Sequence, residues 1–316
     1  MSPLRDALTR YLTLRRVLGT RLDEPAKALG HFVTFLETEG ASHITTVLAL
    51  RWAMLPKGVQ RATWARRLSM VRRFATWLNA SDPETEVPPP RLLPGRRRRN
   101  RPHIFTDAEI GLLMAEAARL PSPTGLRPLT YTTLIGLLAS TGLRPGEALA
   151  LDNPDVDLKN GMLSIRQTKF GKSRFVPLTH STREALQQYA DRRDALGVTP
   201  RSPAFLLSEN GARVPGSAAR RTFATMSCAI GLRPAMVQRR CGRGPRLQDL
   251  RHTFTTRTLV DWYRTGVDIE RALPKLSTYL GHVDVGLTYW YVEAVPELLN
   301  LATKRLTIAH VPGGDR

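Results

Sequence analysis

The sequence predicts a mainly α-helical protein with one small β-hairpin, an α+β chain in two domains. Apolar residues recur three and four positions apart through much of its 316 residues, which is the period of an amphipathic helix. Two short runs of alternating apolar residues flank a lysine-containing turn near residue 170, as the strands of a hairpin do. A stretch rich in proline and arginine, residues 83–103, predicts a linker between the domains.

Residues 1–82 are expected to form a helical domain. A first apolar stripe has helical spacing and consists of Leu4, Leu8, Tyr11, Leu14 and Leu18. The sequence Asp23-Glu24-Pro25 predicts the start of a second helix, because acidic groups and proline favour a first turn, and Gly40 predicts its end. A later apolar stripe consists of Trp64, Leu68, Val71, Phe74 and Leu78.

Positive charge gathers beside the later stripe and in the linker. A charged helix face is usually just solvated, but one so one-sidedly positive favours contacts with phosphates. The basic run in the linker fits an exposed connection, and it equally fits a strap across a DNA backbone. The DNA-binding residues predicted in this half of the chain are Arg66, Arg67, Arg72, Arg73, Arg96, Arg97, Arg98 and Arg99.

The overall charge points to a polyanionic partner. Forty-seven Lys and Arg residues against 27 Asp and Glu residues give a formal net charge of +20. Such an excess repels itself in the folded chain unless a polyanion neutralises it, and its spread through a folded sequence favours nucleic acid. Charge alone leaves a ribosomal or merely basic protein open.

Membrane, secretion and metal signals are not found in the sequence. No apolar run approaches the roughly 18 residues that a membrane span needs, and residues 1–16 are too charged for a secretory signal. We therefore expect a cytoplasmic protein without membrane contacts. Cys228 and Cys241 fit no zinc-binding spacing, and we expect neither a metal nor another cofactor.

The second half of the chain opens with clear helix signals. Thr106 and Glu109 predict a capped helix start. An apolar helix over residues 129–140 is expected to end at Gly142, and Arg144 precedes Pro145, so another helix can begin at once with Glu147 in its first turn. A cation fixed beside a carboxylate at such a junction suits a phosphate clamp, and it equally suits a structural salt bridge.

Further along, a hairpin is predicted from residues 162–168 and 174–178, with lysine at its tip. Gln248 and Arg251 lie three positions apart, on one face of a predicted helix. A short helix is expected to begin near Pro274 and to end at Gly281. Residues 296–309 have the pattern of a terminal amphipathic helix, a candidate for exchange between protomers.

Five motifs in this order resemble the tyrosine recombinases, the phage integrase family. They are Thr-Gly-Leu-Arg-Pro-Gly-Glu at 141–147, the lysine hairpin, Gln-Asp-Leu-Arg-His at 248–252, Leu-Gly-His at 280–282, and a tyrosine nine residues later. The resemblance implies a catalytic domain over 104–316 and a core-binding domain over 1–82. The sequence at 288–299 also resembles transposon-associated members that occur in sets.

The resemblance implies a covalent attack on DNA. Tyr291 would be the nucleophile, Arg144 and Arg251 would hold the non-bridging oxygens of the scissile phosphate, and Glu147 would orient Arg144. Two guanidiniums suit a phosphate that gains charge in the transition state. Aromatic residues at such positions are more often core, and only the resemblance selects Tyr291 over Tyr289.

Other groups complete the implied site. Lys169 would protonate the leaving 5′ oxygen, with Lys172 as the second choice, and His282 would steady the transition state. The further DNA contacts expected in this domain are Lys172, Arg174 and Arg243. The partner would be double-stranded DNA, bound by a homotetramer on paired sites or by an assembly with related recombinases, without ATP or metal.

One residue departs from the family pattern. Gln248 stands where the family usually has histidine, and glutamine donates hydrogen bonds but transfers no proton near neutral pH. His252 does not replace it, because that position is commonly histidine in members that already have the first one. Gln248 therefore predicts reduced activity or dependence on partner recombinases. For the whole chain, the resemblance implies a site-specific DNA recombinase that cleaves and rejoins DNA. The alternatives are a DNA-binding protein of the same fold without catalysis and, third, a type IB topoisomerase, which shares the chemistry.

Overall fold

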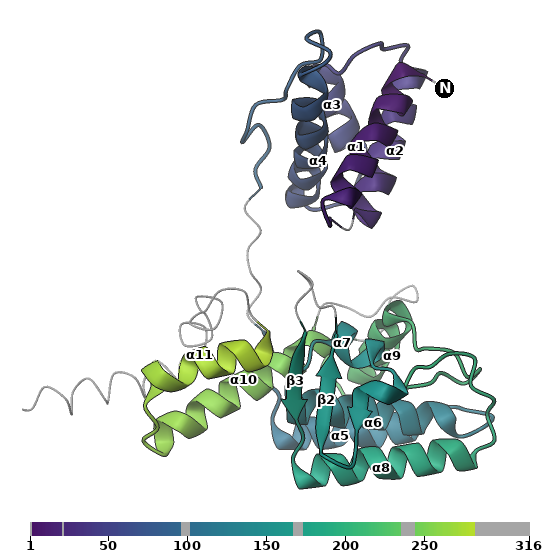
Figure 1. The fold of residues 1–316 in the computed structure, drawn as a ribbon, viewed down its shortest axis with the longest axis vertical. Coiled ribbons are helices and arrows are strands. Elements are labelled where there is room, and N and C mark those ends of the chain that lie inside the picture. Colours follow the sequence, from purple (N-terminus) through teal and green to yellow (C-terminus); the bar gives the residue numbers. More distant parts are fainter. Residues whose placement is uncertain (1, 21, 96–101, 167–172, 235–243, 282–316) are drawn as a thin grey trace, which may run out of the picture. The chain divides into compact units, whose positions relative to one another are not determined.

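The computed structural model describes residues 2–20, 22–95, 102–166, 173–234 and 244–281. The chain divides into two compact units, residues 1–100 and 101–316. In the described residues the units are mostly helical, with a small three-stranded sheet in the second (Figure 1), which confirms the predicted fold class. The division lies inside the predicted linker. No helix in these described ranges is long and apolar enough to cross a bilayer.

The first unit consists of α1 (Pro3–Val17), α2 (Asp23–Thr38), α3 (Thr46–Met54) and α4 (Arg61–Asn79). Its core joins all four helices, and the rings of Phe32 and Trp52 pack 5.1 Å apart at its centre. The predicted start of α2 and the apolar stripe of α4 are confirmed. The first stripe lies on α1 as predicted up to Leu14, but only Leu4, Leu8 and Tyr11 are buried, while Leu14 and Leu18 are exposed.

The first part of the predicted linker is held on this four-helix unit. Thr85 is buried and its hydroxyl accepts a hydrogen bond from the Ile44 backbone N–H at 3.3 Å. Arg72 of α4 donates to the carbonyls of Pro88 and Pro89, both at 2.6 Å. Residues 83–89 therefore belong physically to the first unit.

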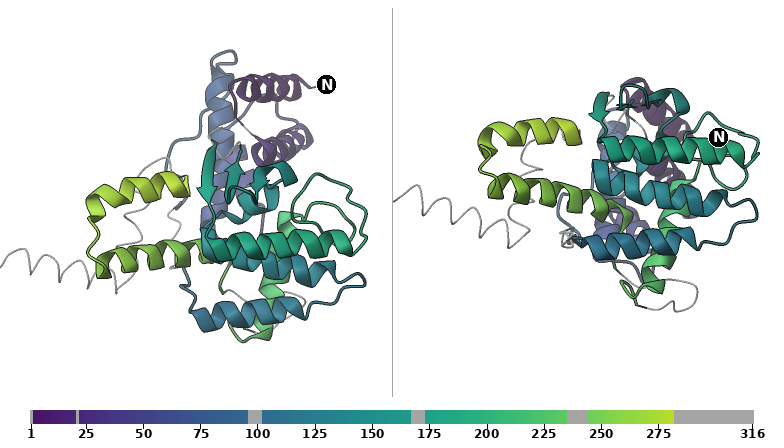
Figure 2. Two further views of the ribbon diagram at one scale, coloured as in Figure 1. Left: turned by 60° about the horizontal axis from the view of Figure 1, so that its bottom comes forward. Right: turned by 90° about the horizontal axis from the view of Figure 1, so that it is seen from below.

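The second unit contains α5 (Asp107–Ala118), α6 (Leu126–Thr141), α7 (Pro145–Ala150), α8 (His180–Ala195), α9 (Gly216–Ala229), α10 (Leu247–Arg264) and α11 (Ile269–Leu280). Helix α6 packs against α5, α8 and α10, and α5, α6 and α8 lie side by side (Figure 2). The first turns of α10 enter this core with Leu247 and Leu250, while its later turns pack against α11 through Leu259 and Leu273.

The sheet is antiparallel, in the order β1 (Val156–Asp157), β2 (Met162–Ile165) and β3 (Arg174–Pro177), and a short 3₁₀ turn, Asn153–Asp155, precedes it. Leu163 pairs with Val176 across β2 and β3, which confirms the predicted hairpin. The first strand was not predicted, because two residues carry no alternation pattern. The hairpin tip, residues 167–172, lies outside the described residues.

Most predicted helix boundaries in the second unit are confirmed, and one is wrong. Thr106 and Glu109 form the predicted capping box, and Gly142 ends α6 in a left-handed conformation. Helix α11 ends at Gly281 as predicted but begins at Ile269, so that Pro274 lies inside it. The earlier start follows from Asp268, whose side chain accepts a hydrogen bond from the Arg271 backbone N–H and caps the helix.

Candidate active site at the end of helix α11

A tight junction between α6 and α7 places Arg144. Gly142 has φ +63°, and a Cβ at this position would overlap the ring of Phe254 from α10. Arg144 is the extended N-cap residue of α7, directly before Pro145. Glycine is required here for its backbone conformation and for the close approach of α10, and the result is an arginine held at a fixed point between three helices.

Glu147 holds this arginine from one side and a second arginine from the other. Its carboxylate accepts from Arg144 through the backbone N–H (3.0 Å) and Nη1 (2.7 Å), and from Arg174 Nη2 of β3 (2.7 Å). Burial works to raise the pKa of Glu147, but the hydrogen bonds and charges of Arg174 and Arg144 outweigh it and hold the pKa below its ordinary value. Glu147 is therefore ionised at neutral pH.

Arg251 comes to the same place from α10. It donates to the Gly142 carbonyl (3.1 Å) and to the Leu280 carbonyl (2.7 Å), and it is 1% exposed. A phosphate can reach this guanidinium only after the groups that cover it move. Gln248, half-buried, lies one turn earlier on the same helix face.

The end of α11 is where the three arginines meet. The last carbonyls of a helix lack partners within the helix and carry partial negative charge, so they attract cations. Three successive carbonyls each accept a hydrogen bond from a different element: Tyr279 from Arg174 Nε of β3 at 2.7 Å, Leu280 from Arg251 Nη2 of α10 at 2.7 Å, and Gly281 from Arg144 Nη2 at the start of α7 at 3.0 Å. We call Arg144, Arg174 and Arg251 the arginine cluster.

Gly281 makes this convergence possible. It has φ +67°, and a Cβ there would lie 2.8 Å from Arg174 Nη1 and 3.1 Å from its Cζ. Two of these guanidiniums, those of Arg144 and Arg174, bond to one carboxylate, that of Glu147, so this pair carries one positive charge more than the carboxylate offsets. A phosphate is the kind of ligand that neutralises such a surplus.

Tyr279 lies at the cluster but is poorly suited to act as a nucleophile. Its hydroxyl donates to the Thr141 carbonyl at 3.0 Å, and its ring stacks on Phe254 with centroids 5.7 Å apart. Burial raises the pKa of Tyr279 to about 12, against the opposing charges of Arg174 and Arg251. The hydroxyl is thus harder to ionise than that of a free tyrosine.

The structure brings together part of the predicted site. Arg144, Glu147 and Arg251 meet at the end of α11, with Gln248 on the Arg251 face. Lys169, His282 and Tyr291 lie outside the described residues. The described residues contain no group of His, Cys, Asp and Glu side chains that could hold a metal ion.

Arg174 occupies a different environment from the expected DNA contact. Its side chain is 10% exposed and is bonded to Glu147 and to the Tyr279 carbonyl. The strand pattern carried a signal for this: alternation puts Arg174 on the face of the buried Val176, while the intervening Phe175 is 72% exposed. The charge of the residue had suggested the solvent side.

The arginines predicted on α4 differ in what they contact. Arg66 pairs with Glu24, Arg67 stacks over the Trp52 ring at 3.7 Å from its centroid, and Arg72 holds the proline carbonyls described above. Arg73 is exposed. The other expected DNA contacts lie outside the described residues and are Arg96, Arg97, Arg98, Arg99, Lys172 and Arg243.

His252 follows Arg251 on α10 and is partly buried. Burial lowers the pKa of His252 to about 4, with Asp249 opposing the shift and Arg246 and Arg251 adding to it. The imidazole is therefore neutral at physiological pH. It does not supply the charge that Gln248 lacks.

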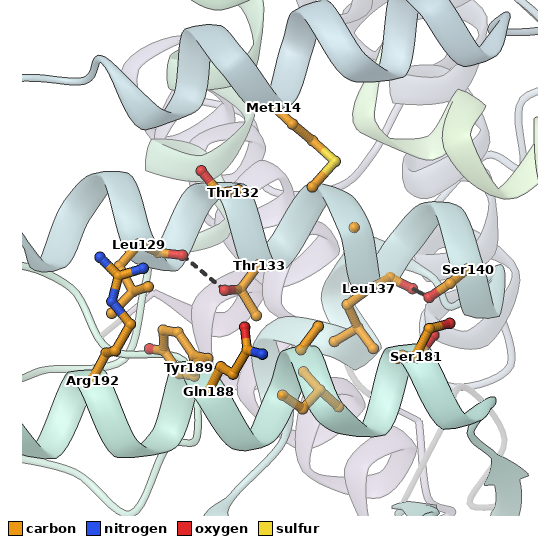
Figure 3. A pocket seen from close by; sticks show the side chains of 14 residues that line it. Met114, Leu129, Thr132, Thr133, Leu137, Ser140, Ser181, Gln188, Tyr189 and Arg192 are labelled. Carbon is orange, nitrogen blue, oxygen red and sulfur yellow. Dashed lines mark hydrogen bonds between the residues drawn. The ribbon is translucent and has the colours of Figure 1, made fainter.

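A second candidate site is a cavity of about 360 Å³ between α6 and α8, partly covered by Met114 of α5 (Figure 3). Its lining is mostly apolar, with Leu129, Leu137 and Tyr189 facing it, and Arg192 at the rim is the one charged residue among those that line it. A single cation on an apolar wall does not form a phosphate site, so the arginine cluster remains the candidate.

Residues 104–297 match the model of the "Phage integrase family". The chain is 45% identical over 310 residues to the Sinorhizobium fredii protein named "Putative integrase/recombinase y4rB", covering 97% of this chain and 98% of that protein. It is 30% identical over 310 residues to the tyrosine recombinase XerC of a Mycobacterium species, covering 92% and 94% of the two chains.

Solved structures share the fold. The integrase of transposon Tn1549, in complex with transposon right end DNA, matches with a TM-score of 0.65 at 17% identity, over 95% of this chain and 99% of that one. A lambda integrase tetramer bound to a Holliday junction matches with a TM-score of 0.58 at 17% identity, over 89% of this chain and 77% of that one.

Proposed function

Since the chain belongs to the phage integrase family and is a site-specific DNA tyrosine recombinase, we propose that the arginine cluster at the end of α11 is where it holds the scissile phosphate. The observation that carries this proposal is the convergence of Arg144 and Arg251 on successive carbonyls of one helix turn. They come from positions more than 100 residues apart, yet both are held at the end of α11, where Arg144 also bonds to Glu147.

Arg144 is the guanidinium that a phosphate meets first. Its side chain is 33% exposed, whereas Arg251 is covered in the free chain. Planar guanidiniums bind phosphate oxygens with two parallel hydrogen bonds, and the bond strengthens as the phosphorus becomes pentacoordinate and gains charge. We propose that DNA binding uncovers Arg251 so that both arginines hold the non-bridging oxygens.

The chemical step is assigned by resemblance to residues beyond this cluster. The Tyr291 hydroxyl loses its proton to water, which a strongly positive field favours, and its oxygen attacks phosphorus. The bond from phosphorus to the 5′ oxygen breaks, and Lys169 gives that oxygen a proton while His282 steadies the transition state. Attack by a 5′ hydroxyl of the partner strand reverses the step. No ATP or metal is required, because the 3′-phosphotyrosyl bond conserves the energy of the broken linkage. Gln248 donates a hydrogen bond to the phosphate but no proton.

Double-stranded DNA is the proposed substrate, and the formal charge of +20 supports it. By similarity to the lambda integrase tetramer on a Holliday junction, we propose that this chain acts as a homotetramer on two paired sites, with the first unit serving as the core-binding domain. Assembly with related recombinases, on DNA in the cytoplasm, is part of the same proposal.

A trapping assay tests the proposed nucleophile. Nicked DNA that spans the ends of the encoding mobile element loses its short 5′-hydroxyl fragment on cleavage, so the covalent complex accumulates. Wild type and Tyr289→Phe should form a covalent protein–DNA product, and Tyr291→Phe should form none. Tight, salt-sensitive binding by the wild type without any covalent product would contradict catalysis and favour a DNA-binding partner. Restoration of cleavage by Gln248→His would then show that this residue is the cause.

A further inference from the structure

We propose that Arg174 is a positioning residue: it divides the Glu147 carboxylate and thereby leaves Arg144 free to bind a phosphate of the DNA. This inference rests on the proposed function only in that the phosphate site is the one held by Arg144. It assigns to Arg174 a role inside the protein in place of a contact with the DNA backbone.

The contacts of Arg174 are all directed inward. Its Nη1 and Nη2 donate to the two oxygens of Glu147 at 3.2 and 2.7 Å, and its Nε donates to the Tyr279 carbonyl at 2.7 Å. Both side chains of this ion pair are about one-tenth exposed. Taking such a pair out of water is costly, and three directional bonds fix its geometry as a single arrangement.

Glu147 is the joint through which Arg174 acts on Arg144. Each oxygen of the carboxylate is shared: one accepts from the side chains of both arginines, and the other accepts from the Arg144 backbone N–H and from Arg174. Without Arg174, the whole charge of Glu147 falls on Arg144. An arginine that is neutralised within the protein binds a phosphate more weakly.

Arg174 also fixes the turn against which Arg144 is aligned. The Tyr279 carbonyl that it holds lies two residues before the Gly281 carbonyl that Arg144 contacts. Loss of Arg174 therefore frees an orphan carbonyl of the last turn of α11 at the same time as it changes the charge beside Arg144.

The test is a binding cycle that needs no cleavage. In a Tyr291→Phe background, affinities are measured for site DNA in which one uncharged methylphosphonate replaces each phosphate in turn. One position identifies the phosphate that Arg144 holds. There, a methylphosphonate weakens binding when Arg144 is present but has no effect in the Arg144→Gln variant. With Arg174 present, a methylphosphonate at this phosphate should weaken DNA binding about tenfold. In the Arg174→Gln variant, the same methylphosphonate should weaken binding by no more than about threefold. Arg174→Lys, which offers no planar fork, should fall between.

Arg73→Gln serves as the matched control. Arg73 is an exposed arginine of α4, so its loss should weaken binding to charged and methylphosphonate DNA by the same factor. The proposal would be overturned if Arg174→Gln also weakened binding to both DNAs by the same factor, so that charged DNA was still bound about tenfold more tightly than methylphosphonate DNA. This holds whether or not the variant has a lower melting temperature. Failure of the wild type to form a covalent product would contradict the proposed catalysis but leave this cycle readable.

Discussion

At the scale of single residues, Gly281 allows three arginines to share one helix end. An alanine there would adopt φ near +67° at a backbone cost of about 1 kcal/mol, and its Cβ would displace the Arg174 guanidinium. We expect Gly281→Ala to lower the rate of covalent complex formation on nicked DNA by at least about tenfold, because Arg174 and Arg144 lose their alignment.

Gly266 offers the control for that substitution. It has φ +78°, and a Cβ there would meet no heavy atom within 4 Å. Gly266→Ala carries the same kind of backbone strain without touching an arginine, so its cleavage rate should remain close to that of the wild type. Equal losses in the two variants would mean that strain in the α10–α11 hairpin, and not the arginine contact, controls cleavage.

His252 makes stability depend on pH. Its pKa lies near 4 in the folded chain, below the ordinary value of 6.5, so the unfolded chain takes up the proton first as pH falls. The contribution is complete above about pH 6.5 and is lost as pH falls towards 4. Between about pH 7.5 and about pH 5 it amounts to at most about 2 kcal/mol, measurable by urea unfolding at the two pH values.

The substitution His252→Gln should remove that part of the pH dependence, because an amide does not titrate in this range. The difference in unfolding free energy between the two pH values should become smaller in the variant than in the wild type. An identical pH dependence in both chains would show that His252 is solvated enough to keep its ordinary pKa.

The residues of the site whose placement is local could be predicted from the sequence. Gly142, Arg144 and Glu147 lie within six positions, and the turn chemistry of glycine and proline fixes how they face one another. The contacts of Arg174 and Arg144 with the end of α11 span more than 100 residues of sequence. Neither charge nor helical period contains that information, because it arises from packing between β3, α7 and α11.

At the scale of elements, α4 shows why a basic helix face is not uniformly a DNA surface. Arg66 and Arg67 are engaged with Glu24 of α2 and Trp52 of α3. These partners come from other helices, so the sequence of α4 alone predicted equal roles for all its arginines. Arg72 and Arg73, adjacent on the same helix, provide the sharpest comparison.

Arg72→Ala should lower the stability of the first unit, because two carbonyl contacts with Pro88 and Pro89 are lost; the cost should be about 1–3 kcal/mol. Arg73→Ala should leave stability unchanged, weaken DNA binding, and reduce the slope of log affinity against log salt by about one. Thermal unfolding and DNA binding across a salt series measure the two effects. The reverse pattern would assign the phosphate contact to Arg72.

Helix α11 shows a competition between two start signals. Proline favours a first helical turn, which predicted a start near Pro274. The Asp268 side chain instead caps a helix that begins at Ile269, five residues before Pro274. Because Pro274 has no backbone N–H, the carbonyl of Glu270, four residues earlier, receives no helical hydrogen bond. Glu270 is exposed, so water can replace the missing N–H. A cap thus outweighs proline when the orphaned group is hydrated.

At the scale of the whole molecule, the composition of residues 83–103 predicted a linker but did not predict where the first unit ends. Prolines from residue 83 onward excluded a helix, as the structure confirms for residues 83–95. Whether a non-helical segment is free or packed depends on what it touches. Here Thr85 bonds to Ile44 and Glu86 accepts from the Thr46 backbone N–H at 2.7 Å, so the segment completes the four-helix unit.

That extension predicts how the first unit behaves as a fragment. Residues 1–95 contain the whole core of the unit and should unfold cooperatively, whereas residues 1–82 lack Thr85 and the carbonyls that Arg72 holds. Losing these contacts should cost about 2–4 kcal/mol, which corresponds to a melting temperature lower by roughly 10 °C or more for a domain of this size. Circular dichroism melts of the two fragments measure the difference.

Thr85→Val in the longer fragment separates the hydrogen bonds of this residue from the packing of the segment. The substitution keeps the shape of the side chain but removes the acceptor for Ile44 and the donor to Asp82, so it should reproduce only part of the loss. If residues 1–82 melt at the same temperature as residues 1–95, the segment contributes nothing to the unit, and the first domain ends where the prolines begin.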